Sequence, residues 1–268
     1  MDQKKKSSEI ARLENDFEAA INLARPPVPA VPKSRGARVL PESIAYNQTK
    51  TIPVPPDVLG RRRVISGLAT GSYTHAFKVL RTKILQRLRE SNENLLAVTS
   101  PRAGAGSTLT AINLAITLTM DLGNTVLLVD CNLAQPSVHA YFGIKPDFGL
   151  CDRLTDSVPL SEILINPGIE RLVILPGGRP IGRSSEMLMS PQMNDLVHEI
   201  KNRYQSRIIV FDLPPMFPSD DALAFLPSVD SALLVIEAGR STTDEVRRAA
   251  RLIEGAGVRL LGTVLNKC

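Results

Sequence analysis

Residues 101–108 read PRAGAGST, and this stretch decides the fold. It stands between an apolar, strand-like run, Leu95–Thr99, and a helix-like run, Leu109–Leu122. Small residues at a strand-to-helix turn let backbone N–H groups crowd around a chain of phosphates, and the usual pattern of such a loop is GxxxxGK[ST]. The turn therefore predicts a phosphate-binding loop in an α/β domain.

One part of this loop is missing. Thr108 keeps the hydroxyl that binds Mg²⁺, but Ser107 stands at the position of the Lys that reaches the β- and γ-phosphates. Removing one partner of a close charge pair costs about 2–5 kcal/mol, which is roughly 30-fold to several thousand-fold in affinity. We therefore expect ATP and Mg²⁺ to bind weakly. The predicted nucleotide-binding residues of the loop are Ala103, Gly104, Ala105, Gly106, Ser107 and Thr108.

The composition excludes several classes of protein. Aromatic residues make up 4% of the 268 residues and Trp is absent, which disfavours a stacking surface for single-stranded nucleic acid. Cys131, Cys151 and Cys268 are odd in number and widely spaced, so neither a disulfide framework nor a zinc site is expected. Residues 1–16, MDQKKKSSEIARLEND, hold no apolar core of a signal peptide. We expect a cytoplasmic protein.

The excess positive charge lies in the first quarter of the chain. Residues 1–67 hold 12 Lys and Arg against 7 Asp and Glu, a balance of +5 that equals the net charge of the whole chain. We assign residues 1–67 to an N-terminal arm, with a short amphipathic helix at about 8–24 and then a Pro-rich linker, and residues 68–268 to one domain. A basic arm suits an acidic membrane surface or partner, and equally a soluble tether.

Six apolar runs alternate with helical patterns in this domain. Mostly continuous runs of Val, Ile and Leu are typical of a parallel sheet that is covered on both faces. Helix starts are predicted at Ser190 with Pro191 and at a capping box of Thr242 and Glu245. The alternation predicts an α/β fold with a doubly wound, mostly parallel sheet, whose ligand lies at the C-terminal ends of the strands. The predicted strands are Leu95–Thr99, Val126–Asp130, Arg171–Leu175, Ile208–Asp212, Ala232–Glu237 and Leu261–Leu265.

Two carboxylates stand at the ends of predicted strands. Asp212 ends the run IIVFD, and Asp130 ends VLLVD. Either one alone is as readily explained as a cap of a turn, but together with a small-residue loop they predict a Mg–nucleotide site. The predicted metal ligands are Thr108, Asp130 and Asp212, and the two aspartates are the predicted catalytic residues. Asp220 and Asp221 are expected to cap the helix that follows them.

Several segments, in this order and spacing, resemble the bacterial tyrosine autokinases of capsule and exopolysaccharide systems, and most closely the subgroup beside exosortase-type polysaccharide loci. They are TSPRAGAGSTLTAINLA (99–115), TVLLVDCNLAQPSVHAYFG (125–143), LPGGRP (175–180), IIVFDLPPMFPSDDALAF (208–225), VIEAGRSTTDEV (235–246) and GTVLNK (262–267).

The resemblance implies a P-loop fold, ATP and Mg²⁺ as ligands, and Asn266 as a further nucleotide-binding residue. Members of the family couple autophosphorylation and ring assembly to a polysaccharide copolymerase in the membrane. The resemblance therefore implies such a copolymerase as partner, a location peripheral to the inner membrane, and a role in polymerisation and export.

The chain departs from the family pattern at residues that bind phosphate and activate the tyrosine. The loop Lys is Ser107, and the second acidic motif, DxDxR, reads Asp130, Asn132 and Ala134. The second carboxylate of that motif is credited with activating the tyrosine hydroxyl, and an amide cannot accept the proton. We therefore expect a degenerate, catalytically impaired member that acts as a regulator.

The assembly features also depart from the pattern. The motif ExxRxxR is represented by His75, Lys78 and Arg81, and the tyrosine cluster of the family is absent near Cys268. The altered motif either weakens a homo-oligomeric ring or specifies a mixed oligomer with an intact paralogue. No specific nucleic acid is expected as partner.

Two alternatives stay open. Partition and septum-placement ATPases carry an additional Lys near the start of the loop, where this chain has Arg102, whose guanidinium fork suits phosphate. Arg102 is thus a predicted nucleotide-binding residue, and an active tyrosine autokinase that uses it is one alternative. A partition-type ATPase is the other, although it predicts a basic surface where residues 68–268 are neutral.

Overall fold

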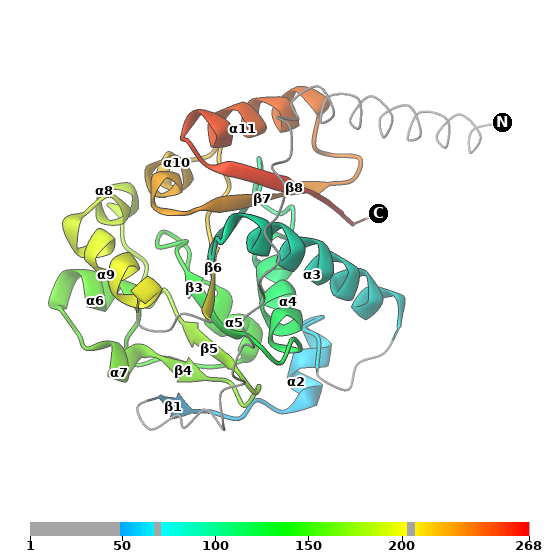
Figure 1. Cartoon of the computed structure of the whole chain (residues 1–268). Coiled ribbons are helices and arrows are strands. Elements are labelled where there is room, and N and C mark those ends of the chain that lie inside the picture. Colours follow the sequence, from blue (N-terminus) through cyan, green and yellow to red (C-terminus); the bar gives the residue numbers. More distant parts are fainter. Residues whose placement is uncertain (1–48, 67–70, 203–206, 268) are drawn as a thin grey trace, which may run out of the picture. The chain divides into compact units, whose positions relative to one another are not determined.

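The computed structural model of the chain describes residues 49–66, 71–202 and 207–267. In these ranges eight strands form one sheet, in the order β1-β4-β5-β3-β6-β2-β7-β8 (Figure 1). Neighbouring strands are parallel except for β4 and β5. The predicted α/β fold with a doubly wound, mostly parallel sheet is confirmed.

Each of the six predicted strands is present, to within two residues at either end. The strands are β1 (Lys50–Thr51), β2 (Leu95–Thr99), β3 (Thr125–Asp130), β4 (Ile165–Asn166), β5 (Leu172–Leu175), β6 (Arg207–Asp212), β7 (Ser231–Glu237) and β8 (Arg259–Asn266). The helices are α2 (Pro56–Arg61), α3 (Ser72–Ser91), α4 (Ser107–Thr119), α5 (Val138–Phe142), α6 (Leu150–Asp156), α7 (Leu160–Ile163), α8 (Ser184–Leu188), α9 (Pro191–Asn202), α10 (Asp221–Phe225) and α11 (Thr243–Gly255), with a 3-10 turn, η1, at Leu226–Ser228.

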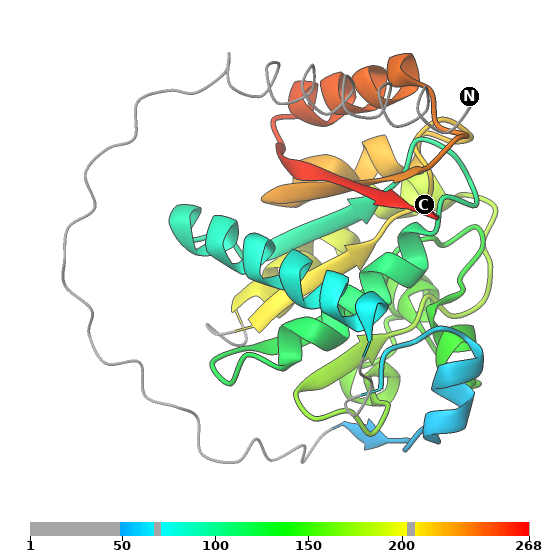
Figure 2. The same ribbon diagram turned by 90° about the vertical axis from the view of Figure 1, so that its right-hand side faces the viewer.

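Helices cover both faces of the sheet, because successive strand residues point to opposite sides. Leu96 and Val98 of β2 pack with α2, α3, α4 and α5 on one face. Leu95 and Ala97 pack with α6 to α11 on the other. Figure 2 shows α3, in cyan, in front of the strands. The central strands are therefore buried on both sides, which explains their continuous apolar sequence.

The helix starts follow the local sequence signals. Glu245 N donates to Thr242 Oγ1 at 3.3 Å and Thr242 N donates to Glu245 Oε2 at 3.0 Å, which completes the predicted capping box of α11. Met193 N donates to Ser190 Oγ at 3.2 Å at the predicted start of α9. Residues 110–119 of α4 are all buried, which accounts for its lack of charge. None of the described helices is both long and apolar enough to cross a membrane.

Residues 50–66 belong to the sheet and the core, although the sequence pattern predicts a linker there. β1 pairs with β4, and Ile52 N donates to Asn166 O at 2.8 Å. Leu59 and Ile65 are buried in the core. The domain thus begins before the predicted boundary, because prolines that favour an extended linker also favour an edge strand and a helix start. The remainder of the arm, with the predicted helix at 8–24, lies outside the described residues, as does Cys268; Cys131 and Cys151 are buried free thiols.

Asn113 of α4 holds this early segment in place. Its side chain is fully buried, Ile65 N donates to its Oδ1 at 2.8 Å, and its Nδ2 donates to Arg63 O at 3.0 Å. The same Nδ2 donates to the hydroxyl of Tyr73, on α3, at 2.8 Å. One amide therefore ties the segment before α3, and α3 itself, to the helix that follows the phosphate loop.

We expect Asn113→Ala to lower the free energy of unfolding by about 2 kcal/mol, because it leaves the buried N–H of Ile65 without an acceptor. Urea unfolding measures this. Asn194→Ala, at an exposed position of α9, is the control and should change stability by less than about 0.5 kcal/mol. Equal effects of the two substitutions would mean that Asn113 does not anchor the segment.

Candidate nucleotide site

The loop between β2 and α4 has the backbone of a phosphate cradle. Gly104 and Gly106 have φ values of +83° and +88°, in the left-handed region that side chains avoid. Alternation of left-handed and right-handed residues turns successive N–H groups toward one side, where they bind anions. Because Gly106 also precedes α4, the helix N-terminus adds its positive end to the same point.

Strand β8 holds the outer side of this loop. Asn266 Nδ2 donates to Ala105 O at 2.8 Å, and Lys267 Nζ donates to Gly104 O at 2.6 Å. A Cβ atom at Gly106 would lie 2.3 Å from Asn266 Nδ2, so the contact requires glycine there. Two adjacent side chains thus bind two adjacent carbonyls, and the loop keeps its shape without a lysine at position 107.

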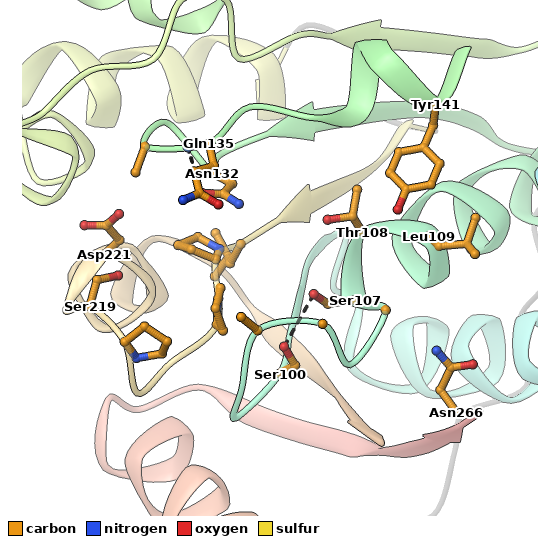
Figure 3. Close-up of a pocket in the computed structure, with 18 of the residues that line it drawn as sticks. Ser100, Ser107, Thr108, Leu109, Asn132, Gln135, Tyr141, Ser219, Asp221 and Asn266 are labelled. Atoms are coloured by element: carbon orange, nitrogen blue, oxygen red, sulfur yellow. Dashed lines mark hydrogen bonds between the residues drawn. The ribbon is translucent and has the colours of Figure 1, made fainter. Parts of the chain in front are cut away.

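Ser107 begins α4 and lies in the pocket (Figure 3). Its hydroxyl is 3.5 Å from that of Ser100, the contact drawn as a dashed line. A hydroxyl is a hydrogen-bond donor but supplies no charge. Position 107 therefore retains polarity and loses the electrostatic part of the loop's usual function.

Strand register brings the two predicted carboxylates together. Asp212 lies opposite Asp130 on β3 and opposite Val98 on β2. β6 is thus the strand between the two, and its tip lies beside the loop that follows β2. The sequence pattern predicts this proximity, because parallel strands end at the same edge of the sheet.

The environment of Asp212 fits a bound cation. Its side chain is fully buried, and neither carboxylate oxygen has a hydrogen-bond partner among the described residues. Burial raises the pKa of Asp212 well above its ordinary value, and the charge of Asp130 raises it further. The hydroxyl of Thr108 is near enough to oppose this rise, but it does not form a hydrogen bond with Asp212. A buried carboxylate without a partner is costly unless a cation approaches it. Asp212 and Thr108 are thus the residues that would hold Mg²⁺.

Asp130 has a different role from Asp212. Its Oδ2 accepts from Ser137 N at 2.8 Å and Val138 N at 2.9 Å, and its Oδ1 accepts from Asn132 N at 3.2 Å. Burial raises its pKa to about 6, and these amides oppose the rise. Both oxygens are occupied by the backbone that leads to α5, so Asp130 shapes the wall of the site. Its predicted metal-binding role stays a prediction.

The pocket in front of the loop has a volume of about 550 Å³, which is in the range of small-molecule and cofactor sites. Asn132 and Gln135 line it from the segment after β3, and Tyr141 lines it from α5 (Figure 3). Asn132 Oδ1 accepts from Gln135 N at 3.3 Å. Asp221 also lines the pocket, and its Oδ2 accepts from Ser184 Oγ at 2.8 Å. Asp220 stands at the N-cap of α10, but its side chain makes no cap hydrogen bond, and Asp221 lies in the first turn. The prediction of a side-chain cap is therefore wrong for Asp220.

Most predicted nucleotide-binding residues meet at this pocket. Two of the predicted residues do not line it. The side chain of Ala105, in the loop, is buried, and the guanidinium of Arg102 is paired with Glu245 of α11. The lining residues from the prediction are Ala103, Gly104, Gly106, Ser107, Thr108 and Asn266. The predicted assembly residues lie apart on α3, where His75 and Lys78 are exposed and Arg81 is half-buried.

Two basic residues of the pocket were missed by sequence reasoning. Arg63 and Lys267 are the basic residues among those that line the pocket. Arg63 stands in a segment that reads as linker, and its φ of +58° has no sequence signature. Lys267 directly follows Asn266, so the motif that indicated Asn266 could have indicated it too.

Comparisons with known proteins agree with this geometry. Residues 93–255 match the AAA domain family AAA_31. The putative tyrosine-protein kinase CapB of Staphylococcus aureus is 28% identical over 191 residues, which are 71% of this chain and 82% of CapB. The tyrosine-protein kinase etk of Escherichia coli (strain K12) is 28% identical over 195 residues, which are 73% of this chain and 26% of etk. The chain thus spans about a quarter of this longer relative.

Solved structures give the same relationship. The crystal structure of the chimerical protein CapA2B2 has a TM-score of 0.71 at 25% identity and covers 82% of this chain and 93% of its own. The kinase domain of the Escherichia coli tyrosine kinase ETK has a TM-score of 0.69 at 25% identity, with 84% and 94% covered. The similarity therefore extends over more than nine tenths of each of these two chains.

We expect Asp212→Asn to stabilise the protein by about 1–2 kcal/mol at about pH 8 without Mg²⁺. The pKa of Asp212 is raised in the folded state, so folding takes up a proton between the ordinary and the raised value. Stability therefore falls as pH rises through that window, in which Asp130 also titrates, and the substitution should reduce the fall.

Urea unfolding at about pH 5 and about pH 8 measures this difference. Asp244→Asn, whose side chain is 95% exposed, is the matched control and should leave the pH dependence unchanged. An Asp212→Asn protein that loses stability between the two pH values as steeply as the wild type would show that Asp212 is not an uncompensated buried charge.

Proposed function

We propose that this chain binds Mg–ATP weakly and regulates polysaccharide synthesis without efficient tyrosine phosphorylation. The chain belongs to the AAA domain family and to the bacterial tyrosine autokinases of capsule and exopolysaccharide synthesis. The observation that carries the proposal is the unpartnered, buried carboxylate of Asp212 beside an intact phosphate cradle. This pair of features suits a cation and an anion at neighbouring points, which is what a Mg–nucleotide presents.

Weak binding follows from the charge at position 107. The N–H groups of the loop and the end of α4 attract phosphate, but Ser107 gives no ammonium to the β- and γ-phosphates. Backbone groups place the nucleotide, and the missing charge lowers its affinity. The nucleotide is thus expected to bind in the usual position with lower affinity.

Impaired phosphoryl transfer follows from Asn132. It lines the pocket where the family has a carboxylate, and its amide oxygen already accepts from Gln135 N. An amide does not take a proton from a tyrosine hydroxyl, so the attacking group stays protonated. A domain with this residue holds a nucleotide more readily than it transfers a phosphate.

The proposed role is the control of polysaccharide polymerisation and export at the inner membrane, in contact with a membrane copolymerase. Relatives named as tyrosine-protein kinases, together with the family resemblance of the sequence motifs, support this setting. The +5 balance of residues 1–67 is compatible with a position near an acidic membrane surface. The exposed face of α3, with His75 and Lys78, is the proposed assembly surface.

A second candidate, an active autokinase that uses Arg102 for phosphate, draws support from the kinase names of the relatives. The ion pair of Arg102 with Glu245 weighs against it, since this side chain must leave a carboxylate on α11 to reach the pocket. The side chain of Arg102 is 57% exposed, so the movement is sterically free. The two candidates differ in what Arg102→Ala does to binding.

We expect Ser107→Lys to strengthen Mg–ATP binding about tenfold and Arg102→Ala to change it by less than about threefold, because only the first alters the charge inside the cradle. Isothermal titration measures both. With radiolabelled ATP and a phosphotyrosine blot, the wild type should show no transfer, and Ser107→Lys with Asn132→Asp should show it.

Other outcomes separate the alternatives. A loss of binding in Arg102→Ala together with tyrosine phosphorylation by the wild type would establish the active kinase. Absence of Mg–ATP binding in both the wild type and Ser107→Lys would refute the nucleotide site itself.

We expect the purified chain to remain a monomer and His75→Glu with Lys78→Arg, which recreates the family motif, to form oligomers. Restored glutamate–arginine contacts between subunits supply the association, and light scattering after size exclusion measures it. Lys83→Arg, on α3 outside the motif, is the control. Rings formed by the unaltered chain would contradict the proposal that the altered motif weakens homo-oligomeric assembly.

A further inference from the structure

The pocket has a charge requirement that the loop alone does not meet. The phosphate chain of ATP carries several negative charges, and the lining also contains Asp221. Thr108 and Ser107 are neutral, and Arg102 is directed to Glu245. Of the residues that line the pocket, Arg63 and Lys267 are the basic ones.

Lys267 is the basic residue that touches the loop. Its Nζ donates to Gly104 O at 2.6 Å and lies 3.2 Å from Glu237 Oε1. Gly104 is one of the two glycines whose left-handed backbone forms the cradle. The ammonium therefore lies on the loop itself, although it comes from the end of β8 and not from α4.

Arg63 occupies a different part of the lining. Burial raises the pKa of Tyr73, on α3, and the positive charge of Arg63 opposes this rise. The carbonyl of Arg63 accepts a hydrogen bond from Asn113 Nδ2. These contacts associate Arg63 with the α3 side of the pocket, whereas Lys267 contacts the loop.

Lys267 can move away from Glu237 without leaving the carboxylate of Glu237 unpaired. Glu237 is 9% exposed, and its Oε1 also lies 3.7 Å from Nη1 of Arg240. The carboxylate thus keeps a cation when the ammonium moves. The backbone beneath Lys267 is fixed, since Asn266 pairs with Glu237 and its carbonyl accepts from Ala238 N at 2.9 Å. A flexible four-carbon side chain on a rigid base suits a short reach to a phosphate oxygen.

We infer that Lys267 is a phosphate-binding residue that takes over part of the role of the charge missing at Ser107. This inference rests on the proposed binding of Mg–ATP. Lys267 binds the Gly104 carbonyl when the site is empty and a phosphate oxygen when the nucleotide is present. The sequence thus keeps one ammonium at the cradle, supplied by the residue that follows strand β8 in place of the first residue of helix α4.

Because Lys267 already supplies one positive charge to the phosphates, a second one at position 107 should increase the affinity less than it would without Lys267. Ser107→Lys and Lys267→Met should therefore be non-additive, because both alter the positive charge around the same phosphates. A lysine added at position 107 should strengthen binding about tenfold where Lys267 is present and about a hundredfold where it is absent. A purely structural clamp on Gly104 O would give no such coupling, since a lysine at position 107 does not rebuild the bond from β8.

Isothermal titration with Mg–ATP tests this on the full chain. We expect Lys267→Met to weaken binding about 10- to 100-fold and Lys267→Arg to retain it within about threefold. Ser107→Lys should restore binding in the Lys267→Met protein and gain about tenfold more there than in the wild type. Lys83→Met, at an exposed position of α3, removes the same charge outside the pocket and should have no effect. Thermal unfolding checks that the variants are folded.

The inference and the proposed function fail in different ways. Binding by the wild type that survives Lys267→Met, or a loss that Ser107→Lys does not repair, overturns the role of Lys267 and leaves the nucleotide site standing. Absence of Mg–ATP binding by the wild type overturns both.

Discussion

The parallel register of β3, β6 and β2 is the constraint on which the site depends. It places Asp212 between the tip of β3 and the phosphate loop, fully buried and without a hydrogen-bond partner among the described residues. Such a group destabilises a folded protein by itself. Two large apolar clusters, one on each face of the sheet, stabilise the fold, which therefore tolerates this cost. A cation beside Asp212 and an anion on the loop would relieve it together, which is why the proposed ligand is a magnesium–nucleotide and not either ion alone.

The shape of the cradle and its charge come from different residues. Gly104 and Gly106 give the loop its backbone, and the side chains at the end of β8 bind its outward carbonyls. A lysine at the start of α4 is needed for neither. Its replacement by Ser107 therefore removes attraction for phosphate and leaves the geometry intact. Asn132 likewise changes acid–base chemistry with little change of shape. Substitutions of this kind separate binding from transfer, whereas loss of a glycine would end both.

The sequence predicts the six long strands, the capped helices and the meeting of the loop with two aspartates, because each follows from local pattern and from the common polarity of parallel strands. It does not predict β1 and β4, which are two residues long and owe their pairing to the surrounding tertiary structure. It also misses the unequal roles of Asp130 and Asp212. Both end similar apolar runs, and only the amides of residues 132, 137 and 138, donated to Asp130, distinguish them. Arg63 reaches the pocket through a left-handed backbone and the buried Asn113, neither of which has a local signature.

Weak nucleotide binding has a functional consequence in a domain that does not transfer the phosphoryl group. A kinase can reset its nucleotide state by chemistry, but a domain without that chemistry can be reset only by dissociation. Its occupancy then follows the free ligand concentration, and the response is steepest when that concentration is near the dissociation constant. Very tight binding would hold such a domain permanently in one state. On this reasoning the loss of the lysine at position 107 and the loss of the carboxylate at position 132 belong together: the first loosens the ligand, and the second removes the reaction that would otherwise release it. A pocket that keeps its cradle, its buried Asp212 and one ammonium beside the loop suits the reversible, non-catalytic nucleotide binding of the proposed function.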